Sequence, residues 1–182
     1  MITERSSLLE VAGLVSRALS EAGITAVLSG GGAVSAYTDN EYQSADLDFV
    51  CSAHMRYLER ALQPLGFERA SQGRARYFDH PKSRWFVEFP PGPVSFGRSF
   101  PAASEFASIA TPYGPLVVIT PTQSVMDRLA AYLHWQDRQA LDQALMVAAH
   151  QTVDAVEIRR WAEAEGMSRT EIDDFLRRSL SK

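Results

Sequence analysis

The composition is that of an ordinary globular protein: of 182 residues, 46% are hydrophobic and 22% are charged. The formal net charge of −4 gives no general signature of nucleic-acid binding. A single cysteine, Cys51, excludes an internal disulfide and fits a reducing cytoplasm. No apolar stretch reaches the roughly 18 residues of a membrane span, and no signal-peptide pattern begins the chain, so we expect a cytoplasmic protein without a membrane partner.

The first third of the chain predicts helices that alternate with strands. Ser7 and Glu10 have the spacing of a capping box, which begins a helix that runs to about Ala22 and ends at Gly23. A short apolar strand, a glycine turn, a short helix and a second strand follow, at 24–28, 30–32, 33–37 and 46–51.

The middle of the chain predicts one more helix, over 53–65, and then short strands that are separated by turns. The strands are expected at 67–70, 74–78, 84–89, 109–111 and 116–119, and Gln72-Gly73 is a plausible hairpin turn between the first two. Residues 90–101 contain four prolines. We therefore expect a loop there, which carries Arg98 and could cover a site.

The pattern becomes wholly helical after Thr120. Helices are expected at about 122–135, 137–150, 154–165 and 169–180. The change predicts a boundary between an α/β core, residues 1–120, and a helical subdomain, residues 121–182.

The chemistry centres on the segment LSGGGAVSAYTDNEYQSADLDF, which runs from Leu28 to Phe49. Because side chains alternate along a strand, Asp46 and Asp48 share one face. Burying two unpaired neighbouring carboxylates is costly, which indicates a divalent metal between them. Glycines at a strand-to-helix turn leave room for phosphate oxygens near backbone N–H groups. The segment therefore predicts phosphoryl or nucleotidyl chemistry.

Two common nucleotide-binding motifs fit this segment poorly. A dinucleotide-binding turn that began with Gly30 and Gly32 would need a third glycine where Ser35 stands, and one acid rather than two. A P-loop would need Gly-Lys-Ser or Gly-Lys-Thr after the glycines, and neither sequence follows them.

The pair Gly30-Gly31, followed after fourteen residues by Asp46-Leu-Asp48, resembles the nucleotidyltransferase fold of the DNA polymerase beta superfamily. Within that superfamily the segment looks most like the small bacterial nucleotidyltransferases related to the AbiEii toxin of abortive-infection and toxin–antitoxin systems. The resemblance spans about 24–90 and is looser over the helices after Thr120. It implies an α/β (α+β) fold, in which a mixed sheet flanked by helices precedes a C-terminal helical region.

The resemblance also implies an activity and a set of metal ligands. Asp46 and Asp48 would hold Mg²⁺ or Mn²⁺ together with a third carboxylate on a later strand, which we assign to Glu88 because it lies mid-strand among apolar neighbours. The enzyme would transfer NMP from an NTP to a hydroxyl of RNA, a protein or a small molecule, and pyrophosphate would leave.

The triphosphate would lie at the glycine turn, and the nucleotide-binding residues that follow from the resemblance are Ser29, Gly30, Gly31, Ser35, Arg84 and Arg128. Related proteins usually carry a basic residue before the Asp-x-Asp strand, where this chain has Tyr42, Gln43 and Ser44, and a lysine where it has Arg128. Positive charge would then come from other arginines, namely Arg74, Arg76, Arg84 or Arg98. Arg84 could equally be an ion-pair partner of Glu88.

The departures from the family pattern leave a second hypothesis open. A catalytically degenerate member of the fold would act as a binding or regulatory module through a protein partner, such as the other half of a toxin–antitoxin pair. It would not need its carboxylates, whereas the enzyme would.

Overall fold

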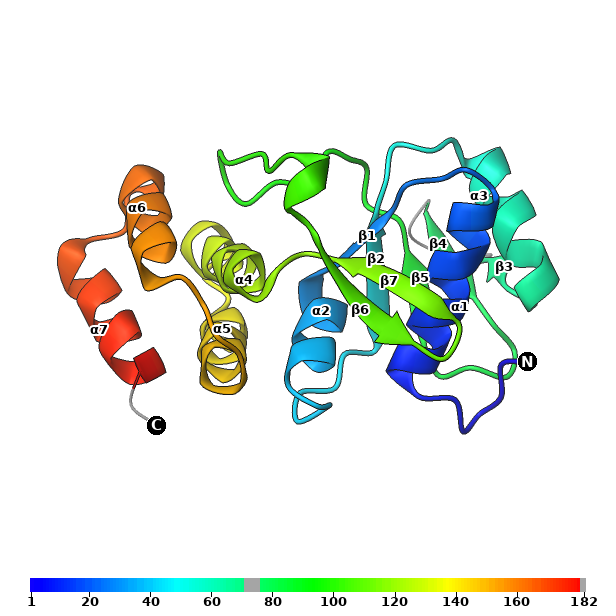
Figure 1. The fold of residues 1–182 in the computed structure, drawn as a ribbon, viewed down its shortest axis with the longest axis horizontal. Coiled ribbons are helices and arrows are strands. Elements are labelled where there is room, and N and C mark those ends of the chain that lie inside the picture. Colours follow the sequence, from blue (N-terminus) through cyan, green and yellow to red (C-terminus); the bar gives the residue numbers. More distant parts are fainter. Residues whose placement is uncertain (71–75, 181–182) are drawn as a thin grey trace.

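The computed structural model of the chain describes residues 1–70 and 76–180, and within them one mixed sheet is packed between helices (Figure 1). Its strands are β1 (Val27–Ser29), β2 (Asp46–Val50), β3 (Glu68–Arg69), β4 (Tyr77–Asp79), β5 (Phe86–Glu88), β6 (Ala107–Thr111) and β7 (Gly114–Val118). They lie in the order β3-β4-β5-β2-β1-β7-β6. The α/β prediction is confirmed.

The register of the central strands brings distant parts of the chain together. β1 runs antiparallel to β2 and places Ser29 opposite Asp48. β2 runs parallel to β5 and places Asp48 opposite Glu88. β4 runs antiparallel to β5, with Tyr77 opposite Glu88. Residues from four separate segments therefore meet on one stretch of the sheet.

One face of the central strands forms the core. Leu47 and Phe49 of β2 and Val87 of β5 are fully buried there. Helix α1 (Leu8–Glu21) packs against β7 and against α3 (Met55–Leu62), which is continued by a short 3-10 helix (Gln63–Leu65). The predicted capping box of α1 is confirmed, since the Ser7 amide donates to Glu10 Oε2 at 2.7 Å and the Glu10 amide to Ser7 Oγ at 3.3 Å.

Helix α2 (Gly30–Tyr37) begins within the glycines that the sequence assigned to a turn. Gly30 has φ +60°, and a Cβ atom there would lie 2.3 Å from Asp48 Oδ2. A Cβ atom on Gly31 would lie 2.6 Å from Ser44 Oγ. Glycine is normally a poor helix former, so the sequence pattern began the helix late. Here the missing Cβ atoms let the helix start directly against β2.

The remaining strands lie near their predicted positions but differ from the prediction in length. The strand expected at 84–89 is confined to β5, and β6 begins at Ala107, two residues before the predicted start. The predicted turn at Gln72-Gly73 lies outside the described residues.

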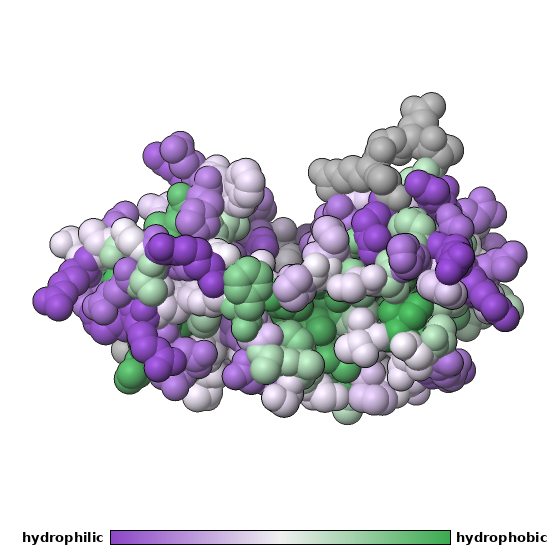
Figure 2. All heavy atoms as spheres, turned by 90° about the horizontal axis from the view of Figure 1, so that it is seen from above, coloured by the Kyte–Doolittle hydropathy of each residue, from purple (hydrophilic) through white to green (hydrophobic). Residues whose placement is uncertain are grey.

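Four helices follow the sheet, close to their predicted positions: α4 (Pro121–Trp135), α5 (Arg138–His150), α6 (Ala155–Glu165) and α7 (Arg169–Leu180). Helix α2 contacts β1 and β2 on one side and α4 and α5 on the other. Figure 2 shows a hollow in the surface between the helical end and the sheet end. The division into domains 1–120 and 121–182 stays a prediction. None of the described helices is long and apolar enough to cross a membrane.

Candidate active site

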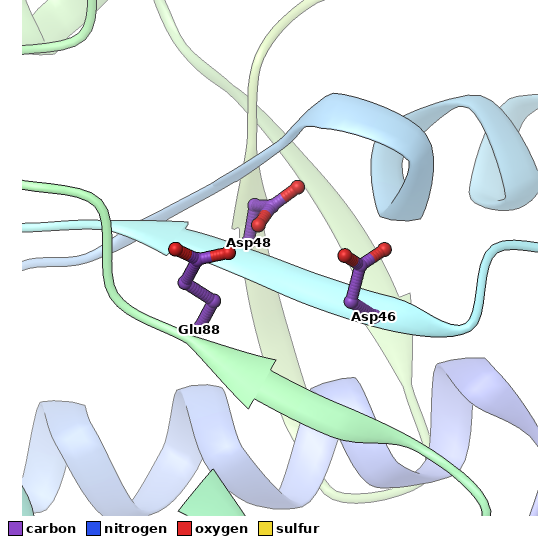
Figure 3. Close-up of side chains that lie close together, drawn as sticks. All are labelled: Asp46, Asp48 and Glu88. Carbon is purple, nitrogen blue, oxygen red and sulfur yellow. The ribbon is translucent and has the colours of Figure 1, made fainter. Parts of the chain in front are cut away.

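Three carboxylates converge on the face of the sheet opposite the core. Asp46 and Asp48 project from β2 and Glu88 from β5, and one oxygen of each lies within 4.8 Å of the others (Figure 3). All three side chains are partly buried. The spacing Asp-x-Asp puts the first two on one face, and the parallel register adds Glu88 beside Asp48.

Two hydroxyl groups hold the Asp46 carboxylate. Ser44 Oγ donates to Asp46 Oδ1 at 2.8 Å, and the Tyr77 hydroxyl donates to Oδ2 at 3.3 Å. The sequence did not reveal these partners, because Tyr77 reaches Asp46 only through the pairing of β4 with β5 and of β5 with β2. Such bonds fix the direction of the carboxylate and leave its remaining lone pairs for a cation.

The surroundings of Asp48 disfavour the charged form of its carboxyl. Its burial raises the pKa of its carboxyl to about 7, and the charges of Asp46 and Glu88 act in the same direction, partly opposed by Arg128. A cation among the carboxylates would remove this cost. Three carboxylates at this separation suit a hard divalent ion such as Mg²⁺ or Mn²⁺, which takes oxygen ligands.

Arg128 of α4 supplies positive charge close to Asp48. Its Nε and Nη2 donate to Asp127 Oδ2 at 2.9 and 2.6 Å, and its Nη1 donates to Gln143 Oε1 at 3.3 Å. Burial alone would lower the pKa of the guanidinium, but the charge and hydrogen bonds of Asp127, together with Asp48, raise it. Arg128 is therefore a fixed, charged group, and Asp127 is a partner that the sequence did not reveal.

A cavity of about 290 Å³ lies over this region. It is lined by Ser29 and Gly30, by Asp48, by Asp127 and Arg128, and by the loop residues between 90 and 96. Residues of the proline-rich loop thus line a cavity beside Asp48, and a role of the loop as a cover for a functional site stays a prediction. The N-terminus of α2 at Gly30 opens into the same cavity, where its backbone N–H groups and helix dipole favour an anion.

The two serines that were predicted to bind nucleotide lie in different surroundings. Ser29 lines the cavity, and its hydroxyl donates to the Asp48 carbonyl at 3.4 Å. Ser35 is fully buried; its hydroxyl donates to the Gly31 carbonyl at 3.1 Å and accepts from the Ser44 amide at 2.9 Å. We therefore regard Ser35 as a residue that holds α2 against the segment before β2.

The other candidate arginines are placed away from this cavity or outside the described residues. Arg84 precedes β5 and stacks over the Trp85 ring at 4.3 Å, and it forms no ion pair with Glu88. Arg76 donates to carbonyls that include those of Cys51 and Ala53. Arg98 contacts Glu165 of α6, with its Nε 3.7 Å from a carboxylate oxygen. Arg74 lies outside the part of the chain that the structure describes.

The comparisons with known proteins agree with this geometry at the level of the fold. No family model and no curated protein matches the sequence. An antigenic nucleotidyltransferase-like protein from Paracoccidioides brasiliensis is similar in structure, with a TM-score of 0.64 and 13% identity over 97% of this chain and 95% of that one. ANT(2″)-Ia, in complex with adenylyl-2″-tobramycin, has a TM-score of 0.59 and 12% identity over 88% and 97% of the two chains.

A solution structure of ANT(2″)-Ia, described as an antibiotic-resistance factor, gives a TM-score of 0.58 and 12% identity over 93% of this chain and 95% of that one. Structural similarity at 12–13% sequence identity shows the fold alone. The chain thus has a nucleotidyltransferase-like fold, as its glycine pair and Asp-x-Asp strand predicted. The closer resemblance to AbiEii-like toxins and the roles of individual site residues stay predictions.

Proposed function

We propose that the protein is a metal-dependent nucleotidyltransferase that moves NMP from an NTP to a hydroxyl group and releases pyrophosphate. The observation that carries the proposal is the set of three carboxylates, within 4.8 Å of one another, beside the glycine-built start of α2. The raised pKa of Asp48 adds to it, because the site is arranged to receive positive charge.

Each residue has a distinct task in this reaction. Asp46 and Asp48, with Glu88, would bind Mg²⁺ or Mn²⁺, which would supply Lewis-acid stabilisation of charge on the transferring phosphoryl group. Glu88 positions the acceptor hydroxyl and takes its proton as the new oxygen–phosphorus bond forms and the bond to pyrophosphate breaks. The backbone N–H groups at Gly30 and Gly31 and the guanidinium of Arg128 hold the phosphates.

A small molecule is the acceptor class that we favour among RNA, protein and small molecules. ANT(2″)-Ia was seen with adenylyl-2″-tobramycin, an adenylylated small molecule, and its chain is covered over almost its whole length. The net charge of −4 also gives no general signature of nucleic-acid binding. A role within a toxin–antitoxin or phage-defence system rests on the sequence resemblance and predicts that expression of the protein slows growth unless a neighbouring gene is present.

Radiolabelled NTPs test the activity directly. The protein is incubated with Mg²⁺, each α-labelled NTP in turn, and either an aminoglycoside panel with tobramycin or a cell lysate separated into small molecules, RNA and protein. We expect label in one fraction with wild type and none with Asp48→Asn or with chelator. No label in any fraction, or equal labelling by Asp48→Asn, would show that the proposal is wrong.

The alternative, a binding module without catalysis, is favoured by one observation. Arg128 already donates two hydrogen bonds to Asp127, so its charge is partly neutralised before any phosphate binds. A module would retain its protein partner after Asp46→Ala, and would bind neither metal nor NTP. Affinity capture with wild type and with Asp46→Ala, together with calorimetry of Mn²⁺ binding, separates the two functions.

A further inference from the structure

A second cavity adjoins the proposed phosphate site. It measures about 530 Å³, within the size range of small-molecule sites, and is bounded by residues between 96 and 105, by the first turns of α4 and by α6. Phe96 lines both cavities. On α4, Met126 lines the second cavity, whereas the next two residues, Asp127 and Arg128, line the first. The two cavities therefore share their walls.

Contacts between the loop and α6 fix the shape of this second cavity. Figure 1 shows the segment between β5 and β6 extending over α4 towards α6. The Trp161 indole donates to the Phe96 carbonyl at 3.1 Å, and the Arg98 amide donates to Glu165 Oε1 at 2.8 Å. The Glu165 side chain is only 2% exposed. The cavity is thus formed before any ligand arrives, so binding need not order it.

The lining combines aromatic rings with unpaired charges. Phe96 and Trp161 are buried, and Phe100 presents its ring at the rim with 65% of its surface exposed. Glu157 and Arg160, three residues apart on α6, line the same cavity, and neither forms an ion pair with any residue in the described ranges. A nucleobase has a flat π face and an edge of donors and acceptors, which this combination complements.

The order of the strands indicates which part of the substrates belongs in this cavity. Glu88 lies on the β5 side of Asp48, and Gly30 lies on the β1 side. The acceptor hydroxyl therefore approaches from the side of β5, and the triphosphate occupies the side of α2 and α4. The rest of the NTP must continue into a space next to the phosphates, and the cavity that shares Phe96 adjoins them.

We propose that this second cavity binds the nucleoside part of the NTP, with the base stacked on Phe100 and its edge recognised by Glu157 and Arg160. The inference rests on the proposed nucleotidyl transfer and adds where the base binds. It makes Glu157 and Arg160 the residues that distinguish one NTP from another.

Calorimetry compares NTP with inorganic tripolyphosphate, both with Mg²⁺ and without acceptor. We expect the preferred NTP to bind wild type about ten-fold more tightly than tripolyphosphate, the order of one base–aromatic stack. Phe100→Ala, Glu157→Gln and Arg160→Gln should each remove most of this difference and leave the affinity for tripolyphosphate unchanged. Phe100 and Arg160 are exposed, so their substitution should not change the temperature of thermal unfolding.

Matched controls lie on the same helix. Arg159 pairs with Asp173 at 2.7 Å and lies outside the cavity, and Glu163 is exposed outside it, so Arg159→Gln and Glu163→Gln should bind NTP like wild type. A second readout is the tryptophan fluorescence in a Trp135→Phe background, where Trp161 emits together with the buried Trp85. A free nucleoside should change it, tripolyphosphate should not, and Trp161→Phe should remove the response.

The outcomes separate this inference from the activity on which it rests. If tripolyphosphate and NTP bind equally well, or if the three variants stay within two-fold of wild type, the nucleoside assignment is wrong while the phosphate site stands. If the variants instead raise the KM of the acceptor alone, the cavity holds the acceptor, and the assignment is again wrong. If neither compound binds with Mg²⁺, both proposals fall.

Discussion

The two faces of β2 make opposite contributions to the protein. Leu47 and Phe49 face the core and are fully buried, so they stabilise the fold through apolar contact. Asp46 and Asp48 face the cavity side, where burial and mutual repulsion raise the pKa of Asp48 to about 7. Alternate residues of one short strand therefore serve stability and chemistry separately, and single substitutions should separate the two properties.

The largest effect on activity is expected from Asp48→Asn. Loss of a metal ligand should lower nucleotidyl transfer by about a thousand-fold, since metal assistance contributes several kcal/mol. Stability should not fall. The folded-state pKa of Asp48 is raised, so wild type loses stability as pH rises from about 4 to about 7, and the variant escapes this loss above pH 7. Rates and thermal unfolding at pH 8 without metal are the measurements, and a strongly destabilised variant would contradict the separation.

Phe49→Ala tests the other face of the same strand. The Phe49 ring lies 6.3 Å from that of Phe89, centroid to centroid, in the core. Truncation should cost about 3–5 kcal/mol of unfolding free energy through lost burial and the cavity left behind. Urea denaturation measures this cost. A variant that unfolds like wild type and yet has lost its activity would show that the core face has a direct role in chemistry.

Gly30→Ala should lower the free energy of unfolding by more than the strain of its positive φ accounts for. Gly30 and Gly23 both have positive φ, +60° and +71°, but only at Gly30 would a Cβ atom meet a neighbour, Asp48 Oδ2, at 2.3 Å. Each substitution pays about 1–2 kcal/mol of backbone strain. Gly30→Ala should in addition displace Asp48 and weaken Mn²⁺ binding. Equal metal affinity in Gly23→Ala and Gly30→Ala would contradict the close packing of α2 on β2.

The affinity for metal should depend on pH in a defined direction. Asp48 must lose its proton to bind a cation, and its pKa is raised to about 7. The affinity for Mn²⁺ should therefore fall about ten-fold per pH unit below pH 7 and level off above pH 8. Calorimetry between pH 5.5 and 8.5 measures it, and a flat profile would mean that Asp48 is not a ligand.

Local patterns predicted much of the fold and part of the site. Local sequence patterns predict the capping box of α1, the helices after Thr120 and the alternation in β2, because each depends on residues that are near one another in sequence. Asp46 and Asp48 share a face for the same reason. Glu88 was assigned with the help of a family resemblance, and the parallel pairing of β5 with β2 brings it beside Asp48.

Contacts between distant segments were beyond the sequence. The sequence left Arg84 open as an ion-pair partner of Glu88, but the strand begins only at Phe86, and Arg84 stacks on Trp85. Tyr77 reaches Asp46 across two strand pairings. The link between Arg98 and Glu165 joins a loop to a helix that lies far along the chain. Sequence periodicity does not predict such contacts, because they depend on how distant segments pack together.

Anomalous diffraction from crystals grown with Mn²⁺ and a non-hydrolysable NTP analogue tests the central claim most directly. We expect manganese among Asp46, Asp48 and Glu88, with the triphosphate at the N-terminus of α2 near Gly30. Nucleotide bound elsewhere, or manganese absent from the three carboxylates while the nucleotide is present, would contradict the claim.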